Sequence, residues 1–261
     1  MKLKNPFKRD RKTVSVVRLH GMIATGRGLH DAGLATALQK AFAAKPAAVA
    51  LAINSPGGSP VQSSLIGARI RRLAEEKETP VYAFVEDVAA SGGYWLAASA
   101  DEIYVDPSSV VGSIGVISAG FGFHELLGQH GVERRVHTAG KSKSMLDPFQ
   151  PEKPADVKRL KGLLDDIHEN FKAHVGARRG DKLAKKDLFT GEIWIGAKAI
   201  DVGLADEIGH LVPTLKEKFG EKTRFKVYGP KKSMLSRMGV SLLHDISHGV
   251  EERAAFARFG L

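Results

Sequence analysis

Short apolar runs alternate with amphipathic stretches along the first half of the chain, and this alternation restricts the folds open to it. The runs are rich in valine, isoleucine and aromatic residues, as buried strands are, and they cover residues 14–19, 48–53, 81–85, 102–105 and 110–117. Between them, apolar residues recur with helical spacing over residues 34–42 and 65–73. Repeated strand and helix units predict an α/β fold, with a mostly parallel sheet flanked by helices.

A long charged segment dominates the second half of the chain. Residues 155–180 predict an exposed helix that ends among glycines. The amphipathic stretch from about residue 233 to 259 predicts a helix packed on its own core, with an oligomer contact or a membrane-facing helix as alternatives. We divide the chain into a basic N-terminal stub (1–13), an α/β domain (14–228) and a C-terminal amphipathic helical extension (229–261).

Composition excludes several classes of site and suggests a compartment. The 261 residues include no cysteine, which rules out disulfides, thiolate metal sites and a cysteine nucleophile. The longest apolar run, residues 47–53, is far shorter than the roughly 18 residues that cross a bilayer, and no apolar run follows the basic start of the chain. We therefore expect a cytoplasmic protein without a signal peptide or a membrane anchor.

The net charge of +10 raises the question of whether the protein binds anionic partners such as membranes or nucleic acid. We expect the basic stub to be a solvated tail, and peripheral contact with an anionic membrane is the alternative. Nucleic acid binding is not expected, because no aromatic residues interleave with the charges as a stacking surface requires.

Two glycine-containing turns follow predicted strands and point to catalysis. INSPGGSP (53–60) places Gly57 and Gly58 at the carboxyl edge of the sheet, where backbone N–H groups can face a developing negative charge. VAASGGYW, after the third strand, surrounds Ser91 with small residues in the pattern of a nucleophile elbow, with an alanine in place of the first glycine. A serine that only caps a helix would have the same neighbours, so the turn alone leaves both interpretations open.

A serine nucleophile needs a base, and lysine is the better candidate here. The histidines are scattered, without a companion carboxylate pattern, whereas GKSKS places Lys141 and Lys143 among small residues after the β-like run ERRVHT (133–138). Ser-Lys dyads can replace Ser-His-Asp triads. A lysine amine titrates at about 10.4 in water, so a lysine base near neutral pH needs about 4 kcal/mol of differential stabilisation, mostly from desolvation.

Several motifs in the same order resemble the signal peptide peptidase A family of serine proteases, also called protease IV. They are INSPGG, VEDVAASGGYWLA, DPSSVVGSIGV, GKSKSMLDPF and TGEIWIGAKAIDVGLADEIG, and the match runs from about residue 14 to 228. The resemblance implies a fold like the Clp protease subunit and the crotonases. It also implies a Ser-Lys endopeptidase that cleaves hydrophobic peptides such as signal-peptide remnants, with residues 14–228 as the peptidase domain.

The resemblance assigns a role to five positions. Ser91 is the nucleophile and Lys143, the second lysine of GKSKS, is the general base. Ser113 matches the position that hydrogen-bonds the lysine amine, and Gly58 and Gly92 match the oxyanion-hole donors. No cofactor is implied.

Short members of the family form rings, so we expect a cyclic homo-oligomer with the active site at the subunit interface. Lys143 can then act in its own chain or in a neighbour's. Most relatives carry an N-terminal transmembrane segment where this chain has its basic stub, which puts access to signal peptides in doubt.

Two other functions and a metal site are alternatives to this prediction. A crotonase-type acyl-CoA enzyme would also use glycine amides, but would need neither Ser91 nor Lys143. An inactive scaffold of the same fold, binding a partner by its basic face, is the third possibility. A metal site at His244 and His248 is not expected, because Asp245 stands where zinc proteases have a glutamate.

Overall fold

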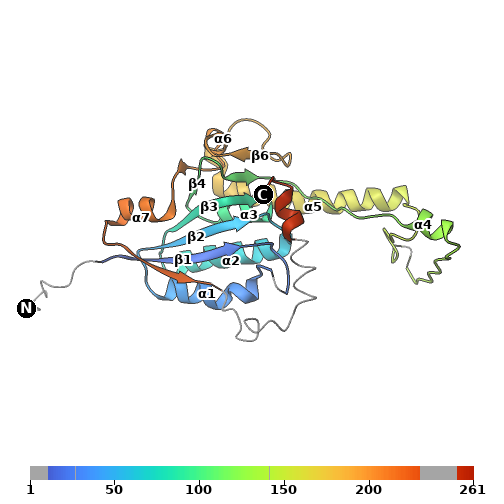
Figure 1. The fold of residues 1–261 in the computed structure, drawn as a ribbon, viewed down its shortest axis with the longest axis horizontal. Helices are drawn as coiled ribbons and strands as arrows, with labels where there is room; N and C mark the ends of the chain where they lie inside the picture. Colours follow the sequence, from blue (N-terminus) through green and yellow to red (C-terminus); the bar gives the residue numbers. More distant parts are fainter. Residues whose placement is uncertain (1–10, 27, 141, 230–251) are drawn as a thin grey trace, which may run out of the picture. The chain divides into compact units, whose positions relative to one another are not determined.

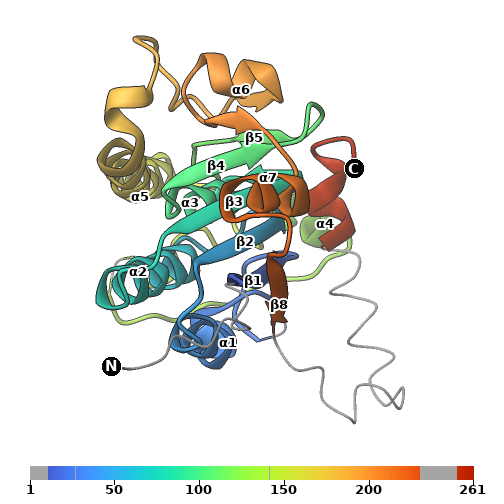
Figure 2. The same ribbon diagram turned by 90° about the vertical axis from the view of Figure 1, so that its left-hand side faces the viewer.

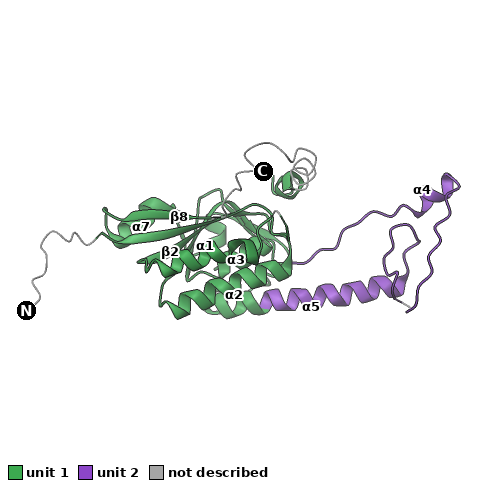
Figure 3. Ribbon diagram, turned by 90° about the horizontal axis from the view of Figure 1, so that it is seen from below, with its two compact units in different colours: residues 1–114, 173–261 green, residues 115–172 purple. Residues whose placement is uncertain are grey.

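The computed structural model describes residues 11–26, 28–140, 142–229 and 252–261. The chain forms two compact units: unit 1 comprises residues 1–114 and 173–261, and unit 2 comprises residues 115–172 (Figure 3). Unit 2 holds the short helix α4 (His124–Gln129) and most of α5 (Pro154–Arg179), which ends in unit 1. Both boundaries between the units, after residues 114 and 172, fall inside the predicted peptidase domain 14–228. The start and end of that domain remain predictions.

One sheet forms the centre of unit 1. Its strands within the described residues are β1 (Thr13–His20), β2 (Ala48–Ser55), β3 (Val81–Ala90), β4 (Glu102–Val105), β5 (Val110–Gly112), β6 (Ile193–Ile195), β7 (Glu207–Ile208) and β8 (Arg224–Tyr228). The main order is β6-β5-β3-β2-β1-β8, with β4 joining β3 to β7. All pairs are parallel except β5 with β6, as the alternation of strands and helices predicts.

Helices cover both faces of this sheet (Figures 1 and 2). Those of unit 1 that surround the sheet are α1 (Asp31–Ala43), α2 (Pro60–Glu76), α3 (Gly92–Ala98), α6 (Ala197–Asp201) and α7 (Leu211–Phe219). Side chains of β1 alternate between the faces: Val14 and Val16 pack with Leu215 of α7, whereas the hydroxyl of Ser15 donates to Ala41 O of α1. The predicted α/β fold is therefore confirmed.

Strand β3 is longer than predicted, and β5 is shorter. β3 continues past residue 85 because its first half pairs with β4 and its last three residues pair with β5. The predicted strand 110–117 is wrong beyond residue 112. Gly112 and Ser113 adopt φ values of 105° and 50°, which turn the chain out of the ladder.

The predicted long charged helix is confirmed as α5. The predictions for residues 133–138 and for the C-terminal extension have different outcomes. Residues 133–138, the β-like run before the lysines, form no strand. Residues 252–257 of the C-terminal extension are helical. Lys141, the pair His244 and His248, most of the basic stub and residues 230–251 lie outside the described residues. No helix in the described part of the chain has the length and apolar content to cross a membrane.

A buried arginine fixes the end of α5 in unit 1. The Arg179 side chain is 1% exposed, donates to Gly203 O at 2.7 Å and pairs with Asp206 at 2.7 Å. Burial raises the pKa of Asp206, but hydrogen bonds from Arg179 and Lys182 outweigh it, so the pKa lies below its usual value. The carboxylate is thus charged at neutral pH and needs its partners.

Replacing Arg179 by methionine should therefore destabilise the protein strongly. We expect Arg179→Met to lower the free energy of unfolding by about 3 kcal/mol, because it leaves a partly buried carboxylate with one cation instead of two. Urea denaturation at pH 7 measures this loss. The control is Arg72→Met, which removes the surface pair with Glu76 and should cost less than about 1 kcal/mol. Equal losses in the two variants would contradict the role of burial.

Candidate active site

Ser91 lies on a sharp turn between β3 and α3. Its backbone angles are φ 51° and ψ −122°, a conformation that costs a residue with a side chain about 1–3 kcal/mol. The turn is held on both sides, since the Ser91 N–H donates to Gly112 O at 2.8 Å and the Trp95 N–H donates to Ser91 O at 3.0 Å. A strained residue fixed in this way indicates a functional position.

The capping interpretation of Ser91 can be judged by comparison with Ser59. Both serines precede a helix, at the N-cap positions of α3 and α2. The Ser59 hydroxyl accepts a hydrogen bond from the Gln62 N–H, whereas the Ser91 side chain makes no capping bond. Ser91 therefore occupies the capping position without capping the helix, and its half-buried hydroxyl is left for another role.

The INSPGG turn approaches Ser91 so closely that only glycine fits. A Cβ atom on Gly57 would lie 2.7 Å from Ala90 O, and one on Gly58 would lie 2.1 Å from Ile23 O. An isolated parallel bridge holds the turn, because the Ile23 N–H donates to Gly57 O and the Ser59 N–H donates to Ile23 O. In such a bridge the Gly58 N–H points away from Ile23.

Two backbone N–H groups are adjacent at this turn. Gly92 lies close to Gly58: a Cβ atom added to Gly92 would lie 3.4 Å from the backbone nitrogen of Gly58. Neither the Gly58 nor the Gly92 N–H donates to another described residue. Gly92 opens α3, where the N–H groups have no partner within the helix. The pair is chemically suited to hold an oxyanion.

Ser113 lies beside Ser91 at the end of the neighbouring strand. The register pairs Ala90 with Gly112, so the two serines each follow one member of that pair. Ser113 also has a positive φ, 50°, and its N–H donates to Glu192 O at 2.7 Å. Unit 1 thus brings together Ser91, Ser113, Gly58 and Gly92, four of the five predicted site residues.

Lys143, the fifth predicted site residue, belongs to unit 2. It lies in a turn segment, its N–H donates to Gly140 O at 3.2 Å, and its side chain is exposed. The assignment of Lys143 as the base therefore stays a prediction, as do the roles of the other four residues.

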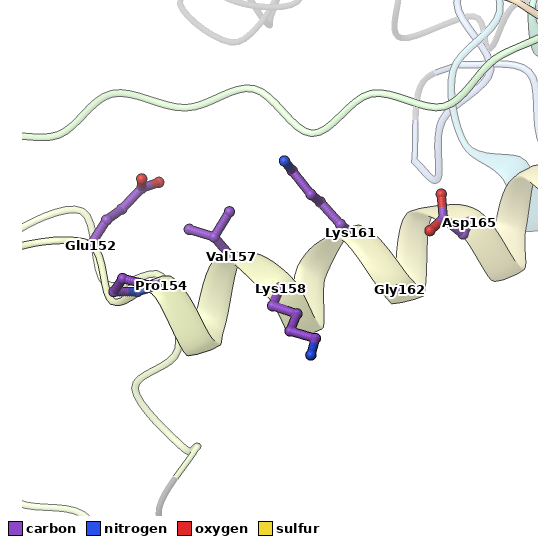
Figure 4. A pocket seen from close by; sticks show the side chains of 7 residues that line it. All are labelled: Glu152, Pro154, Val157, Lys158, Lys161, Gly162 and Asp165. Carbon is purple, nitrogen blue, oxygen red and sulfur yellow. The ribbon is translucent and has the colours of Figure 1, made fainter.

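Two hollows in the described residues do not involve Ser91 or Lys143. One, of 440 Å³, lies in unit 1, and its lining includes Ala52, Phe84, Leu211, Asp106 and His210. The other, of 660 Å³, lies in unit 2 and is lined only by residues between Glu152 and Asp165 (Figure 4). In Figure 4 the Lys158 side chain points to one side of α5, whereas the side chains of Glu152, Lys161 and Asp165 point to the other.

Sequence analysis missed Ile23 as a part of the site. Its contribution is a backbone pairing with the INSPGG turn, and such a pairing leaves no mark in residue type. It also missed His174, whose ring lies against Trp95 of α3. Nothing in the sequence near either position indicates these contacts.

Comparisons with known proteins agree with the geometry. The model of peptidase family S49 matches residues 73–222. A putative protease of Synechocystis sp. is 32% identical over 78% of this chain and 73% of its own length.

Two Brucella proteins, from Brucella melitensis and Brucella abortus, are named Na(+)/H(+) antiporter NhaA and are 48% identical over 98% of this chain. This chain spans 38% of the length of each, so their name describes much longer proteins.

A solved structure shares the fold. A mutant of the 1510-N membrane-bound stomatin-specific protease, in complex with a substrate peptide, aligns over 90% of this chain and 99% of its own, with a TM-score of 0.50 and 16% identity. The expected Clp-protease-like fold is consistent with this likeness. Because the family model covers more than half of the residues and the Synechocystis protein matches over most of its length, the chain belongs to peptidase family S49.

Proposed function

We propose that this protein is a serine endopeptidase with a Ser-Lys dyad, in which Ser91 is the nucleophile and Lys143 the general base. Its substrates are hydrophobic peptides such as remnants of signal peptides. The observation that carries the proposal is the strained turn at Ser91, whose hydroxyl does not cap α3 and which lies beside two amides that have no partner among the described residues. Membership of peptidase family S49 supports the same reaction class.

Each residue has a defined step in this reaction. The Ser91 Oγ attacks the peptide carbonyl while its proton passes to the neutral amine of Lys143, and Ser113 orients that amine. The N–H groups of Gly58 and Gly92 donate to the resulting oxyanion, and each contributes about 3 to 4 kcal/mol to the transition state. The protonated lysine then gives its proton to the leaving amine, and water hydrolyses the acyl-enzyme.

The preference for apolar peptides follows from the need for a neutral lysine. The Lys143 side chain is exposed in the free chain. A bound apolar peptide excludes water from Lys143 and so disfavours its charged ammonium form. Binding of the substrate thereby helps to produce the neutral amine that acts as the base.

We also propose that copies of the chain assemble into a ring with the active site at the subunit interface. Unit 2 exposes large apolar side chains, including Phe121 at 81%, Ile117 at 67%, Val132 at 52% and Leu126 at 49%. A second copy of the chain is the partner we assign to this surface, since exposed apolar patches of this kind mark interaction sites.

Removing either member of the dyad should abolish cleavage. We expect Ser91→Ala and Lys143→Ala each to lower kcat by at least about 1,000-fold, because the two groups act as a unit. Cleavage of a fluorogenic apolar peptide measures this. Lys158→Ala, which removes another exposed lysine of unit 2, is the control and should retain activity. Unchanged peptide cleavage in both dyad variants would refute the proposal, and a wild-type protein that turns over an acyl-CoA but cleaves no peptide would favour the crotonase-type alternative.

Mixing the two inactive variants distinguishes a shared site from a site within one chain. If a neighbour supplies the lysine, chains with Ser91→Ala provide the amine and chains with Lys143→Ala provide the hydroxyl, so exchange of subunits restores cleavage. If each chain uses its own pair, the mixture stays inactive. Co-purification of an untagged variant with its affinity-tagged counterpart verifies that mixed oligomers have formed.

The strain at Ser91 has a cost that can be measured without substrate. We expect Ser91→Gly to raise the free energy of unfolding by about 1 kcal/mol, because glycine adopts the positive φ without strain and this outweighs its own entropic cost. Urea denaturation provides the value. Ser108→Gly is the matched control: Ser108 is exposed and has no positive φ, so the same change should lower stability by about 0.5–1 kcal/mol. A loss of stability in Ser91→Gly would argue against strain at the nucleophile.

A further inference from the structure

The hydroxyl of Ser63 fills the space that a side chain on Gly92 would take. Ser63 lies near the start of α2 and is fully buried. A Cβ atom added to Gly92 would lie 2.3 Å from the Ser63 Oγ. The next nearest atoms, the Ile23 Cδ1 and the Gly58 nitrogen, would lie 3.2 and 3.4 Å from it, which is close to ordinary contact. The Ser63 hydroxyl is therefore the group that excludes a side chain at position 92.

The backbone of Gly92 does not itself require glycine. Gly57 and Gly58 have φ values of 100° and 138°, whereas Gly92 is not among the residues with a positive φ. As the first residue of α3, Gly92 has a conformation that alanine also adopts. The absence of a side chain at position 92 thus reflects the contact with Ser63, which lies directly against the residue that carries a predicted oxyanion donor.

The same hydroxyl is bonded to the turn that carries Gly58. The Ser63 Oγ donates to Ser59 O at 2.9 Å, and the Ser63 N–H donates to the same oxygen at 3.0 Å. Ser59 follows Gly58 directly, and its own N–H donates to Ile23 O at 2.7 Å. One buried hydroxyl therefore contacts both segments that carry a predicted donor, Gly58 through Ser59 and Gly92 directly.

The distance between two oxyanion donors has to be exact to a few tenths of an ångström. Each N–H must place its nitrogen about 2.7–3.1 Å from the position of the developing oxyanion. Because neither the Gly58 N–H nor the Gly92 N–H donates to another described residue, packing sets their positions. The Ser63 Oγ is suited to this task, since its own hydrogen bond fixes its rotamer and makes it a spacer of constant size.

We propose that Ser63 is a positioning residue for the oxyanion site: its buried hydroxyl sets the separation of the Gly58 and Gly92 N–H groups. The inference rests on the proposed function, because it concerns the oxyanion that forms when Ser91 attacks a peptide. Ser63 acts through the two glycines and does not itself touch the substrate.

Removing the hydroxyl should slow the reaction without weakening the binding of substrate. Oxyanion donors act in the transition state, so we expect Ser63→Ala to lower kcat by at least about tenfold and to leave KM within about twofold. Cleavage of a fluorogenic apolar peptide measures both constants. A boronate of the same peptide, in which a tetrahedral oxygen mimics the oxyanion, should bind less tightly by about the factor lost in kcat.

Ser99 provides a matched control at the other end of α3. Its hydroxyl is equally buried and donates to the carbonyl oxygen four residues earlier, that of Trp95, at 3.0 Å. It also lies against a glycine, since a Cβ atom on Gly67 would be 2.7 Å from the Ser99 Oγ. Gly67 has no predicted role in catalysis. Ser99→Ala should therefore lower the midpoint of urea denaturation about as much as Ser63→Ala does, but keep the wild-type kcat.

A double variant tests the contact between Ser63 and Gly92. Gly92→Ala alone places a methyl group against the Ser63 Oγ, and we expect it to lower kcat by about 100-fold or more. When Ser63→Ala is added, the nearest remaining atoms lie at 3.2 Å and beyond, so the methyl group has room. The double variant should then be at least about tenfold faster than Gly92→Ala. Two independent harmful changes would make the double variant the slowest of the three.

The outcomes separate this inference from the proposed function. With Ser91→Ala inactive, an unchanged kcat in Ser63→Ala or a double variant slower than Gly92→Ala overturns the role of Ser63 and leaves the proposed function intact. Equal losses of kcat in Ser63→Ala and Ser99→Ala also overturn it, because they would reflect stability alone. Full peptide cleavage by Ser91→Ala refutes the proposed function itself.

Discussion

The candidate site depends on the backbone hydrogen bonds that hold Ser91, first among them the bond from its N–H to Gly112 O at the end of the pairing between β3 and β5. This bond holds Ser91, the residue after the strand pair, in its positive-φ conformation. Without it, a serine would relax to an ordinary conformation and its hydroxyl would move away from the INSPGG turn. The sheet therefore stabilises a local conformation that the residue itself disfavours.

Close packing, more than polar contacts, fixes α3 and the INSPGG turn around Ser91. Every residue of α3 is buried, and Gly57 brings the neighbouring turn against Ala90 O. Such packing leaves little freedom for the two amides of Gly58 and Gly92, which is the preorganisation that an oxyanion site needs. The exposed lysine of unit 2 contrasts with this rigidity. The division gives the strained Ser91, the predicted nucleophile, to one unit and the predicted base to the other.

The strands and the two glycine turns could be predicted because their signals are local. Apolar runs with bounding glycines mark β1, β2 and β4 to within two residues, and the small residues around Ser91 mark the elbow. The sequence-based predictions of strands were wrong where pairing with distant strands decides whether a segment forms a strand. β3 extends through Glu86 and Asp87 because two different strands pair with its two halves, and both side chains face outward. Residues 133–138 have strand-like composition but no strand in the described chain.

By itself, the sequence indicated the fold class, the order of the main elements, the serine, the two lysines and the glycine turns, since residue type and spacing carry that information directly; the choice of Lys143, Ser113 and Gly92 came from the family resemblance. Only the tertiary structure decided which N–H groups have no partner among the described residues, that the Ser91 hydroxyl does not cap its helix, and that His174 stacks on Trp95. These features arise between residues far apart along the chain, and the hydrogen bonds and contacts that remain open depend on how the whole of unit 1 packs.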